Sequence, residues 1–363
     1  MTDGHENLIV ARAGAAGRIT LDRAPKMNAL TARMVRGMAD TLAVWAADSS
    51  LRFVVIDGAG KTGLCAGGDI REVYESSLRA DGAAPRFWAE EYRLNATIAT
   101  YPKPIVAFMR GTVMGGGVGI SAHASHRIVT DSTRLAMPEV RIGFIPDVGG
   151  TWLLARAPGE TGTYLALTGE RIGAADAIAL GLADRYVPEA SLASLTEALL
   201  SCDARTSDDL WAAIDAFAAT PAAVGPVVAH RATIDRAFGA DDVAKIVEAL
   251  ARDGSPFALA TRETLVPNSP TSLKLTLRAL REARTLPDLP ACLQMEYRIM
   301  CRLYGSFDTI EGVRAAVVDK DRNPKWQPAT LAEVTDGSLE RYFVSLGDAE
   351  LSFDAQAAMR AVR

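Results

Sequence analysis

The sequence lacks the features that mark membrane-spanning, secreted and nucleic-acid-binding proteins. No uninterrupted apolar run reaches ~18 residues, so we expect no membrane span. The first residues, MTDGHENLIVARA, have no basic stretch before an apolar core, which argues against a secretory signal. Lysine and arginine (39) are fewer than aspartate and glutamate (44), and the formal charge of −5 gives no support for a nucleic-acid-binding face.

Cysteine and histidine are also scarce, and their spacing argues against two further kinds of site. The four cysteines, Cys65, Cys202, Cys292 and Cys301, lie far apart and form no CxxC pair. We therefore expect neither a disulfide framework nor a zinc knuckle, and cysteine usage fits a cytoplasmic protein. His123 and His126 lie three residues apart, but no third ligand is evident, so we expect no metal site.

Short apolar runs alternate with helical periodicity over the first ~190 residues. A helix is expected from Thr31, and five runs predict strands: RITL (18–21), FVVID (53–57), PIVAFM (104–109), HRIVTD (126–131) and RLAM (134–137). This alternation predicts an α/β architecture with crossover connections. After about residue 200 long amphipathic stretches predict helices. We therefore expect a core over residues 1–200 and a mostly helical C-terminal region over 201–363.

Two glycine-rich loops each follow a buried strand and precede a predicted helix. They are CAGGDI (65–70) and GGG (115–117). Glycine lets the backbone approach a ligand closely, and N–H groups at a helix start carry a partial positive charge. Two such groups that converge on one carbonyl oxygen form an oxyanion hole. Two ordinary tight turns are the alternative, and neither loop matches a phosphate-binding or dinucleotide-binding pattern.

Two carboxylates lie eight residues apart in RLAMPEVRIGFIPDVGGTW (134–152), among apolar neighbours. Glu139 and Asp147 would be costly there unless something satisfies or uses them. Structural alternatives remain open at this point. Glu139 fits a first-turn glutamate favoured by the helix dipole, and Asp147 fits an N-cap for a helix through Trp152. Glu91, in the amphipathic stretch RFWAEEYRLN, fits a solvated glutamate.

Taken with LDRAPKMNALT (21–31) and YPKPIVAFMRGTVMGGGVGIS (101–121), these motifs resemble the crotonase (enoyl-CoA hydratase/isomerase) superfamily. The subgroup of 3-hydroxyisobutyryl-CoA hydrolases is the most similar, through EEYRLN, PDVGG and GVRAAVVDKDRNPKWQP (312–328). The resemblance implies a spiral core of repeated ββα units, a helical C-terminal region and an acyl-CoA thioester as ligand. It implies no cofactor beyond the CoA of the substrate, and it allows a homo-oligomer.

The resemblance also assigns roles to individual residues. The backbone N–H groups of Gly68 and Gly116 are the implied oxyanion donors. Glu139 acts at the thioester carbonyl, as nucleophile or as the base that activates water. Asp147 binds the substrate hydroxyl or positions water, and Glu91 contacts the same polar end. The implied contacts to CoA lie around Lys26, Ala66, Asp69 and Ile70.

One position separates the candidate reactions. Hydratases of this superfamily use a second glutamate just after the GGG loop, because one group activates water while the other handles the α-carbon proton. Gly119 occupies that position here. We therefore expect hydrolysis of a short branched β-hydroxyacyl-CoA, foremost 3-hydroxyisobutyryl-CoA of valine breakdown. An enoyl-CoA hydratase/isomerase and a catalytically silent CoA-binding protein are the alternatives. Arg141, two residues from Glu139, would depress the glutamate pKa if it faced the site.

Overall fold

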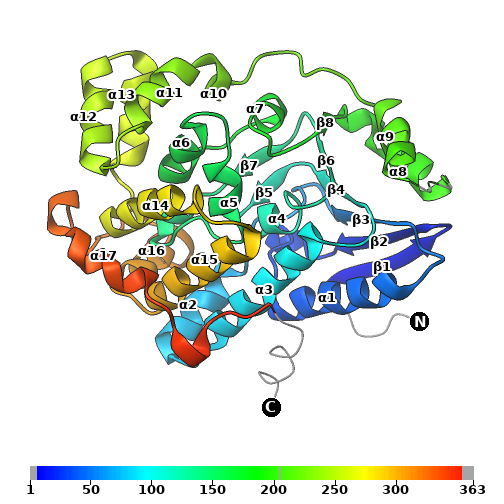
Figure 1. Cartoon of the computed structure of the whole chain (residues 1–363), viewed down its shortest axis with the longest axis horizontal. Coiled ribbons are helices and arrows are strands. Elements are labelled where there is room, and N and C mark those ends of the chain that lie inside the picture. Colours follow the sequence, from blue (N-terminus) through cyan, green and yellow to red (C-terminus); the bar gives the residue numbers. More distant parts are fainter. Residues whose placement is uncertain (1–5, 203, 205, 354–363) are drawn as a thin grey trace. The chain divides into compact units, whose positions relative to one another are not determined.

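The computed structural model (Figure 1) describes residues 6–202, 204 and 206–353. The chain divides into two compact units. Both units are discontinuous in sequence. Unit 1 comprises Met1–Gly68, Leu94–Ala136 and Arg171–Ala229, and unit 2 comprises Asp69–Arg93, Met137–Glu170 and His230–Arg363. Each unit takes residues from both sides of residue 200, so the boundary expected there from composition stays a prediction.

Unit 1 is built on a six-stranded sheet with the order β1-β2-β3-β4-β6-β8 (Figure 1). Only the β1–β2 pair is antiparallel, and the other neighbours are parallel. All residues of β3 and β4 are buried, as is usual for the central strands of a parallel sheet. The strands are β1 (Leu8–Ala13), β2 (Ala16–Leu21), β3 (Phe53–Gly58), β4 (Ile105–Met109), β6 (His126–Val129) and β8 (Arg185–Tyr186).

A second, two-stranded sheet in unit 1 carries one glycine loop. Strand β5 (Thr112–Met114) pairs in parallel with β7 (Arg134–Ala136), and the short helix α4 (Gly116–Gly119) follows β5 directly. Helices of unit 1 are α1 (Ala32–Ala47), α7 (Ala174–Ala179), α8 (Leu192–Ser201), α9 (Ser207–Asp215) and α10 (Pro226–Ala229), with short 3-10 turns η1 (Ala24–Lys26) and η3 (Glu189–Ser191). Thr31 caps α1 as expected, accepting a hydrogen bond from the Met34 N–H at 3.3 Å.

The five predicted strands are all present, with bounds within two residues of those expected. Three strands were not predicted, for identifiable reasons. Strand β1 exposes most of its side chains, so it carries no buried apolar run. Strands β5 and β8 have three and two residues, too few to show a period. The α/β class is confirmed.

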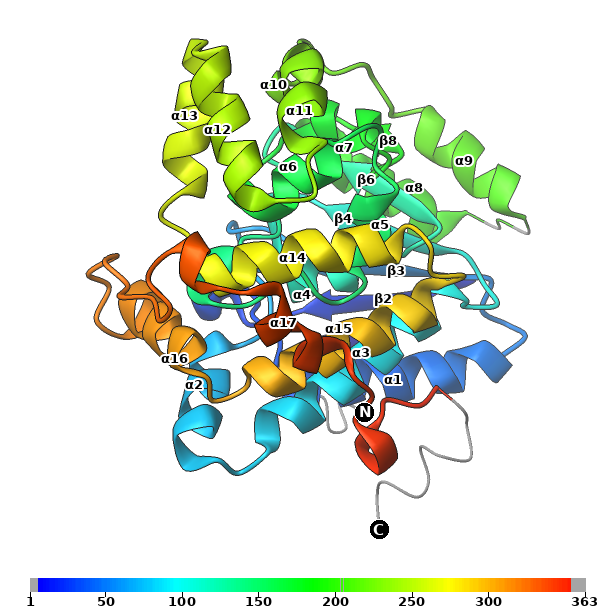
Figure 2. The same ribbon diagram turned by 60° about the vertical axis from the view of Figure 1, so that its left-hand side comes forward.

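Unit 2 is helical, and the predicted helical C-terminal region is confirmed. Every regular element that the described residues form after residue 215 is a helix or helical turn. Serine followed by proline starts two of these helices, because the Ser255 and Ser269 hydroxyls cap while proline fits the first turn. Figure 2 shows the long helices α14 and α15 beside α17. The helices are α2 (Ile70–Arg79), α3 (Ala83–Ala99, which continues into unit 1), α5 (Gly150–Ala155), α6 (Thr161–Thr168), α11 (Arg231–Phe238), α12 (Val243–Asp253), α13 (Pro256–Leu265), α14 (Pro270–Ala283), α15 (Leu289–Leu303), α16 (Phe307–Val313) and α17 (Asp336–Phe343). Short turns are η2 (Glu139–Ile142), η4 (Arg314–Val318), η5 (Leu331–Glu333) and η6 (Gly347–Ala349).

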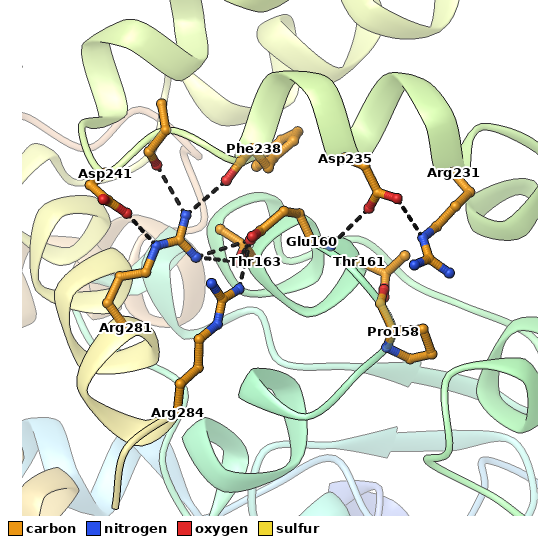
Figure 3. A network of polar contacts seen from close by, with 11 residues as sticks. Pro158, Glu160, Thr161, Thr163, Arg231, Asp235, Phe238, Asp241, Arg281 and Arg284 are labelled. Atoms are coloured by element: carbon orange, nitrogen blue, oxygen red, sulfur yellow. Dashed lines mark hydrogen bonds and ion pairs between the residues drawn. The ribbon is translucent and has the colours of Figure 1, made fainter.

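An ion-pair network joins three helical segments of unit 2 (Figure 3). The Glu160 carboxylate, just before α6, accepts hydrogen bonds from Arg281 at 2.9 Å and Arg284 at 2.8 Å, both from the end of α14. Asp235 of α11 accepts from the Glu160 N–H at 2.8 Å and from Arg231 at 2.8 Å. These carboxylates are therefore neutralised by arginine side chains.

None of the helices traced in residues 6–202, 204 and 206–353 combines the length and the apolar character that crossing a membrane requires.

Candidate active site

The two glycine loops lie against each other in unit 1. Cys65 of the first loop forms a parallel bridge with Val113 of β5, immediately before the second loop. Gly67 has φ +108°, and a Cβ there would lie 3.6 Å from the Gly116 amide nitrogen and 3.3 Å from the Met114 carbonyl oxygen. Only glycine combines this backbone conformation with such a close approach. The loops are therefore brought together by their backbones.

The N–H groups of Gly68 and Gly116 are placed to act as free donors. Gly116 is the first residue of α4, so its N–H has no acceptor within the helix. Gly68 forms a parallel bridge with Leu30, and the Leu30 N–H donates to the Gly67 carbonyl at 2.8 Å. In this parallel bridge Leu30 is hydrogen-bonded to a neighbour of Gly68 and not to Gly68 itself. The Gly68 N–H therefore points away from Leu30. The oxyanion role of these two groups stays a prediction.

Four buried carboxyl groups gather in unit 2. Three were expected from the sequence, Glu91, Glu139 and Asp147, and the fourth is Glu296, which is fully buried on α15. The charge of Asp147 raises the pKa of each of the three glutamates, so the groups interact electrostatically. Carboxylates this close in a buried site cannot all be ionised at once. Burial and the charge of Asp147 therefore favour the protonated form of the three glutamates.

Glu139 is the first residue of η2, and the residue is 9% exposed. Burial raises its pKa well above the ordinary value, and the charges of Asp147, Glu296 and Glu91 raise it further. Its Oε2 has no hydrogen-bond partner among the residues that the structure describes. This oxygen is therefore a buried acceptor that the described residues leave unsatisfied.

Arg141 does not lower the pKa of Glu139. Its guanidinium donates to the Thr168 carbonyl at 3.1 and 2.8 Å and to Glu170 at 2.9 Å, and the residue is exposed. The arginine therefore neutralises a surface glutamate, and the pKa of Glu139 rises instead of falling.

Asp147 is held by a tyrosine and does not cap a helix. The Tyr92 hydroxyl donates to Asp147 Oδ2 at 2.6 Å. Burial raises the pKa of Asp147 to about 6, although the Tyr92 hydrogen bond lowers it. The N-cap residue of α5 is Gly149 and not Asp147. The interpretation of Asp147 as the N-cap is therefore wrong.

Glu91 lies on α3 and is buried, so the solvated-glutamate interpretation is wrong as well. Its exposure is 2%, and its Oε1 has no hydrogen-bond partner in the described part of the chain. Burial raises its pKa well above the ordinary value, with Asp147 as the second cause. An unsatisfied buried acceptor of this kind suits a hydroxyl donor on a ligand.

Tyr92 and Glu296 were not predicted from the sequence as part of the site. The Glu296 carboxylate accepts from the Gly149 N–H at 2.8 Å, and from the Thr151 N–H at 2.9 Å and hydroxyl at 2.5 Å. Burial raises its pKa to about 8, against the effect of these three donors. A signal was present, because position 296 falls on the apolar stripe of α15 with Leu289, Cys292, Leu293, Ile299, Met300 and Leu303, where a glutamate is unexpected.

The residues expected to contact CoA lie in both units. Lys26 and Ala66 belong to unit 1, where Lys26 is exposed at the end of η1 and the Ala66 N–H donates to the Met27 carbonyl at 3.0 Å. Asp69 and Ile70 belong to unit 2, where Asp69 caps α2 through the Arg71 N–H at 3.2 Å. The CoA contacts stay a prediction.

No group of three His, Cys, Asp or Glu side chains suited to a metal occurs in the part of the chain that the structure describes. The His126 side chain is held by an aromatic ring and two hydroxyl groups. Its ring lies 4.2 Å from the Trp211 ring, and its two nitrogens lie 2.9 and 3.1 Å from the hydroxyls of Ser125 and Ser207.

The comparisons with known proteins agree across nearly the whole chain. A model of the family described as enoyl-CoA hydratase/isomerase matches residues 16–343. The chain is 42% identical to the mitochondrial 3-hydroxyisobutyryl-CoA hydrolase of Danio rerio, over 95% of this chain and 91% of that one. A carnitinyl-CoA dehydratase structure from Mycobacterium thermoresistibile is similar at TM-score 0.91 and 46% identity, over 96% of this chain and 99% of that one. An enoyl-CoA hydratase structure from Rhodobacter sphaeroides 2.4.1 is similar at TM-score 0.87 and 40% identity, over 96% and 100%.

The family model matches residues 16–343, which is most of the chain. The chain belongs to the enoyl-CoA hydratase/isomerase family, within the crotonase superfamily.

Proposed function

We propose that the protein hydrolyses the thioester of a short branched β-hydroxyacyl-CoA, with 3-hydroxyisobutyryl-CoA as its substrate. One observation carries the proposal: Glu139 is buried with one free carboxyl oxygen, beside an Asp147 that Tyr92 orients. Curated relatives named 3-hydroxyisobutyryl-CoA hydrolase, at 40–42% identity, support the same substrate.

In the proposed reaction, ionised Glu139 acts at the thioester carbonyl. As a nucleophile it forms a mixed anhydride and expels the CoA thiolate, which takes up a proton, and water then cleaves the anhydride to the free acid. As a base it removes a proton from water, the resulting hydroxide attacks the thioester carbonyl carbon, and the CoA thiolate leaves and takes up a proton. Both routes place negative charge on the thioester oxygen, and the N–H groups of Gly68 and Gly116 are the donors proposed to stabilise it.

Recognition of the substrate hydroxyl is assigned to Glu91 and Asp147. The free Oε1 of Glu91 is a buried acceptor, and a hydroxyl on the acyl group would satisfy it. An acyl group without the hydroxyl would leave that acceptor unpaired, which is the strongest basis for discrimination between such substrates. The enzyme should therefore prefer hydroxyacyl over simple acyl thioesters.

Hydration of an enoyl-CoA is the second candidate, because two similar solved structures are named carnitinyl-CoA dehydratase and enoyl-CoA hydratase. Gly119 counts against it. This residue is buried at the end of α4 and supplies no carboxylate where the hydratases of the superfamily place one.

We further propose a role in valine breakdown, as follows from the substrate, and no cofactor beyond the CoA that the substrate carries. A cytoplasmic location and a homo-oligomeric state stay predictions. The Danio rerio relative is named mitochondrial, which gives the location prediction no support.

Release of free thiol from 3-hydroxyisobutyryl-CoA, followed with a thiol-reactive dye, tests the function. Hydration of crotonyl-CoA is measured in parallel, and both assays are repeated with Glu139→Gln. Glu248→Gln, on the exposed face of α12, is the matched control. We expect thiol release that Glu139→Gln abolishes and Glu248→Gln leaves intact. Hydration without thiol release would replace the hydrolase by the hydratase, and binding without either reaction would favour the silent CoA-binding protein.

A further inference from the structure

The turn that carries Asp147 has an unfavourable backbone conformation. Val148 has φ +53°, and Gly149 follows with φ +80°. A β-branched residue rarely occupies the left-handed region, so the surrounding structure must hold Val148 there. Within the turn, the Gly150 N–H donates to the Asp147 carbonyl at 2.6 Å. This conformation of Val148 has to be maintained by contacts of the turn with neighbouring residues.

Glu296 forms hydrogen bonds to the residues that follow Val148. Its Oε2 accepts from the Gly149 N–H, and its Oε1 accepts from both the N–H and the hydroxyl of Thr151. The carboxyl therefore bonds both residues that flank Gly150, and it is fully buried. Water has no access with which to replace these bonds, so their loss would release the turn.

The Asp147 side chain is held from a different direction. The Tyr92 hydroxyl bonds Oδ2, and the Tyr92 ring packs edge-on against Tyr297, with the ring centres 6.2 Å apart. Tyr297 follows Glu296 on α15. Two adjacent residues of one helix therefore contact the backbone that follows Asp147 and the tyrosine that bonds its carboxyl.

We propose that Glu296 is a positioning residue for Asp147: it does not contact the substrate, but it fixes the turn that aims the Asp147 carboxyl. The kinetic part of this inference rests on the proposed function. A purely structural cap is the alternative, and it would affect stability alone.

Glu296→Gln is the direct variant. The amide nitrogen cannot accept a hydrogen bond, so one backbone N–H of the turn would face another donor. We expect kcat for thiol release to fall about 10–100-fold, since a displacement near 1 Å at a reacting group costs that much. KM should change less than about threefold, because Glu296 makes no substrate contact.

Thr151 gives a conservative pair. Thr151→Val removes one donor to Glu296 and should lower kcat in the same direction, whereas Thr151→Ser keeps the hydroxyl and should retain activity. Asp176→Asn is the matched control. Asp176 is a buried carboxylate of unit 1 that accepts from the N–H groups of Val227 at 3.3 Å and Val228 at 3.0 Å. Its variant should lower Tm and leave kcat unchanged.

A crystal structure of Glu296→Gln tests the inference without any turnover. We expect Val148 to leave positive φ and the Tyr92–Asp147 hydrogen bond to lengthen or break. An unchanged turn, or a lowered Tm with unchanged kcat, would overturn the inference. If the wild-type protein releases no thiol, the proposed function fails, and the structure of the variant alone decides the positioning role. If Glu296→Gln does not fold, the contrast between Thr151→Val and Thr151→Ser decides it.

Discussion

Unit 2 contains two groups of carboxylates that differ in their partners. In the first group, Glu160 forms ion pairs with Arg281 and Arg284, and Asp235 forms an ion pair with Arg231 (Figure 3). Glu91, Glu139, Asp147 and Glu296 have no ion pair among the described residues, and the charge of Asp147 raises the pKa of each of the three glutamates. The pKa of Glu160, in contrast, is lowered despite its burial, because of hydrogen bonds and charge from the two arginines and Thr163.

This difference separates carboxylates that stabilise the fold from carboxylates placed for chemistry. A paired carboxylate stays ionised and connects helices, whereas an unpaired buried carboxyl is retained against its own desolvation cost. Perturbed pKa values that lack a cationic partner are typical of functional sites. Substitutions in both groups test whether this distinction is correct.

Glu139→Gln has the largest expected effect. The amide can neither attack the thioester nor accept a proton, so kcat for thiol release should fall about 10²–10⁴-fold. The free energy of unfolding should not fall, because a neutral amide replaces a carboxyl that has no cationic partner. Thiol release and urea unfolding of the same variant measure both quantities. A marked loss of stability with kcat retained would place Glu139 with the structural group.

Glu160→Gln should show the reverse. Glutamine replaces the carboxylate that Arg281 and Arg284 share by a neutral amide oxygen, so the free energy of unfolding should fall by about 1–3 kcal/mol. The kcat should be unchanged. Urea unfolding measures the loss, with Glu248→Gln on an exposed ion pair as the control of near-zero effect. Equal stability of the two variants would contradict the structural role of the network.

Tyr92→Phe should shift the pH dependence of kcat/KM. The Tyr92 hydrogen bond lowers the pKa of Asp147, which burial places at about 6. Without the hydroxyl the pKa of Asp147 rises, so if the ionised form is needed the acid limb moves to higher pH, by up to about one unit. Tyr101→Phe, which removes a hydroxyl bonded to the Leu42 carbonyl in unit 1, is the control. An acid limb that stays in place, with the basic limb moving to higher pH instead, would show that Asp147 acts in its protonated form.

Arg141→Met has the smallest expected effect. Arg141 is bonded to Glu170 and the Thr168 carbonyl at the surface, so the acid limb of kcat/KM should stay within about 0.2 pH unit of the wild type. The same pH profile measures it. A clear upward shift would mean that this cation does stabilise ionised Glu139, and the contrast between the two carboxylate groups would then be weaker.

Much of the fold was predictable because its signals are local. The strands of the six-stranded sheet with apolar runs, the cap of α1 by Thr31 and the helical region after residue 200 all follow from side-chain periodicity and capping. The candidate residues Glu91, Glu139 and Asp147 came from a resemblance in motifs, and all three prove to be buried. The alternative interpretation of Asp147 as a helix cap is wrong, because a distant side chain satisfies the start of α5 instead.

The α/β class, the glycine loops and the candidate carboxylates could thus be predicted from the sequence alone, since each depends on a short stretch of residues. The partners of those carboxylates depended on folding. Tyr92 reaches Asp147 over 55 residues, and Glu296 reaches Gly149 over 147, and no periodic pattern encodes such pairs. Burial, the strained φ of Val148 and the raised pKa values arise only when α3, α15 and the Asp147 turn exclude water together, because desolvation is a property of the packed environment.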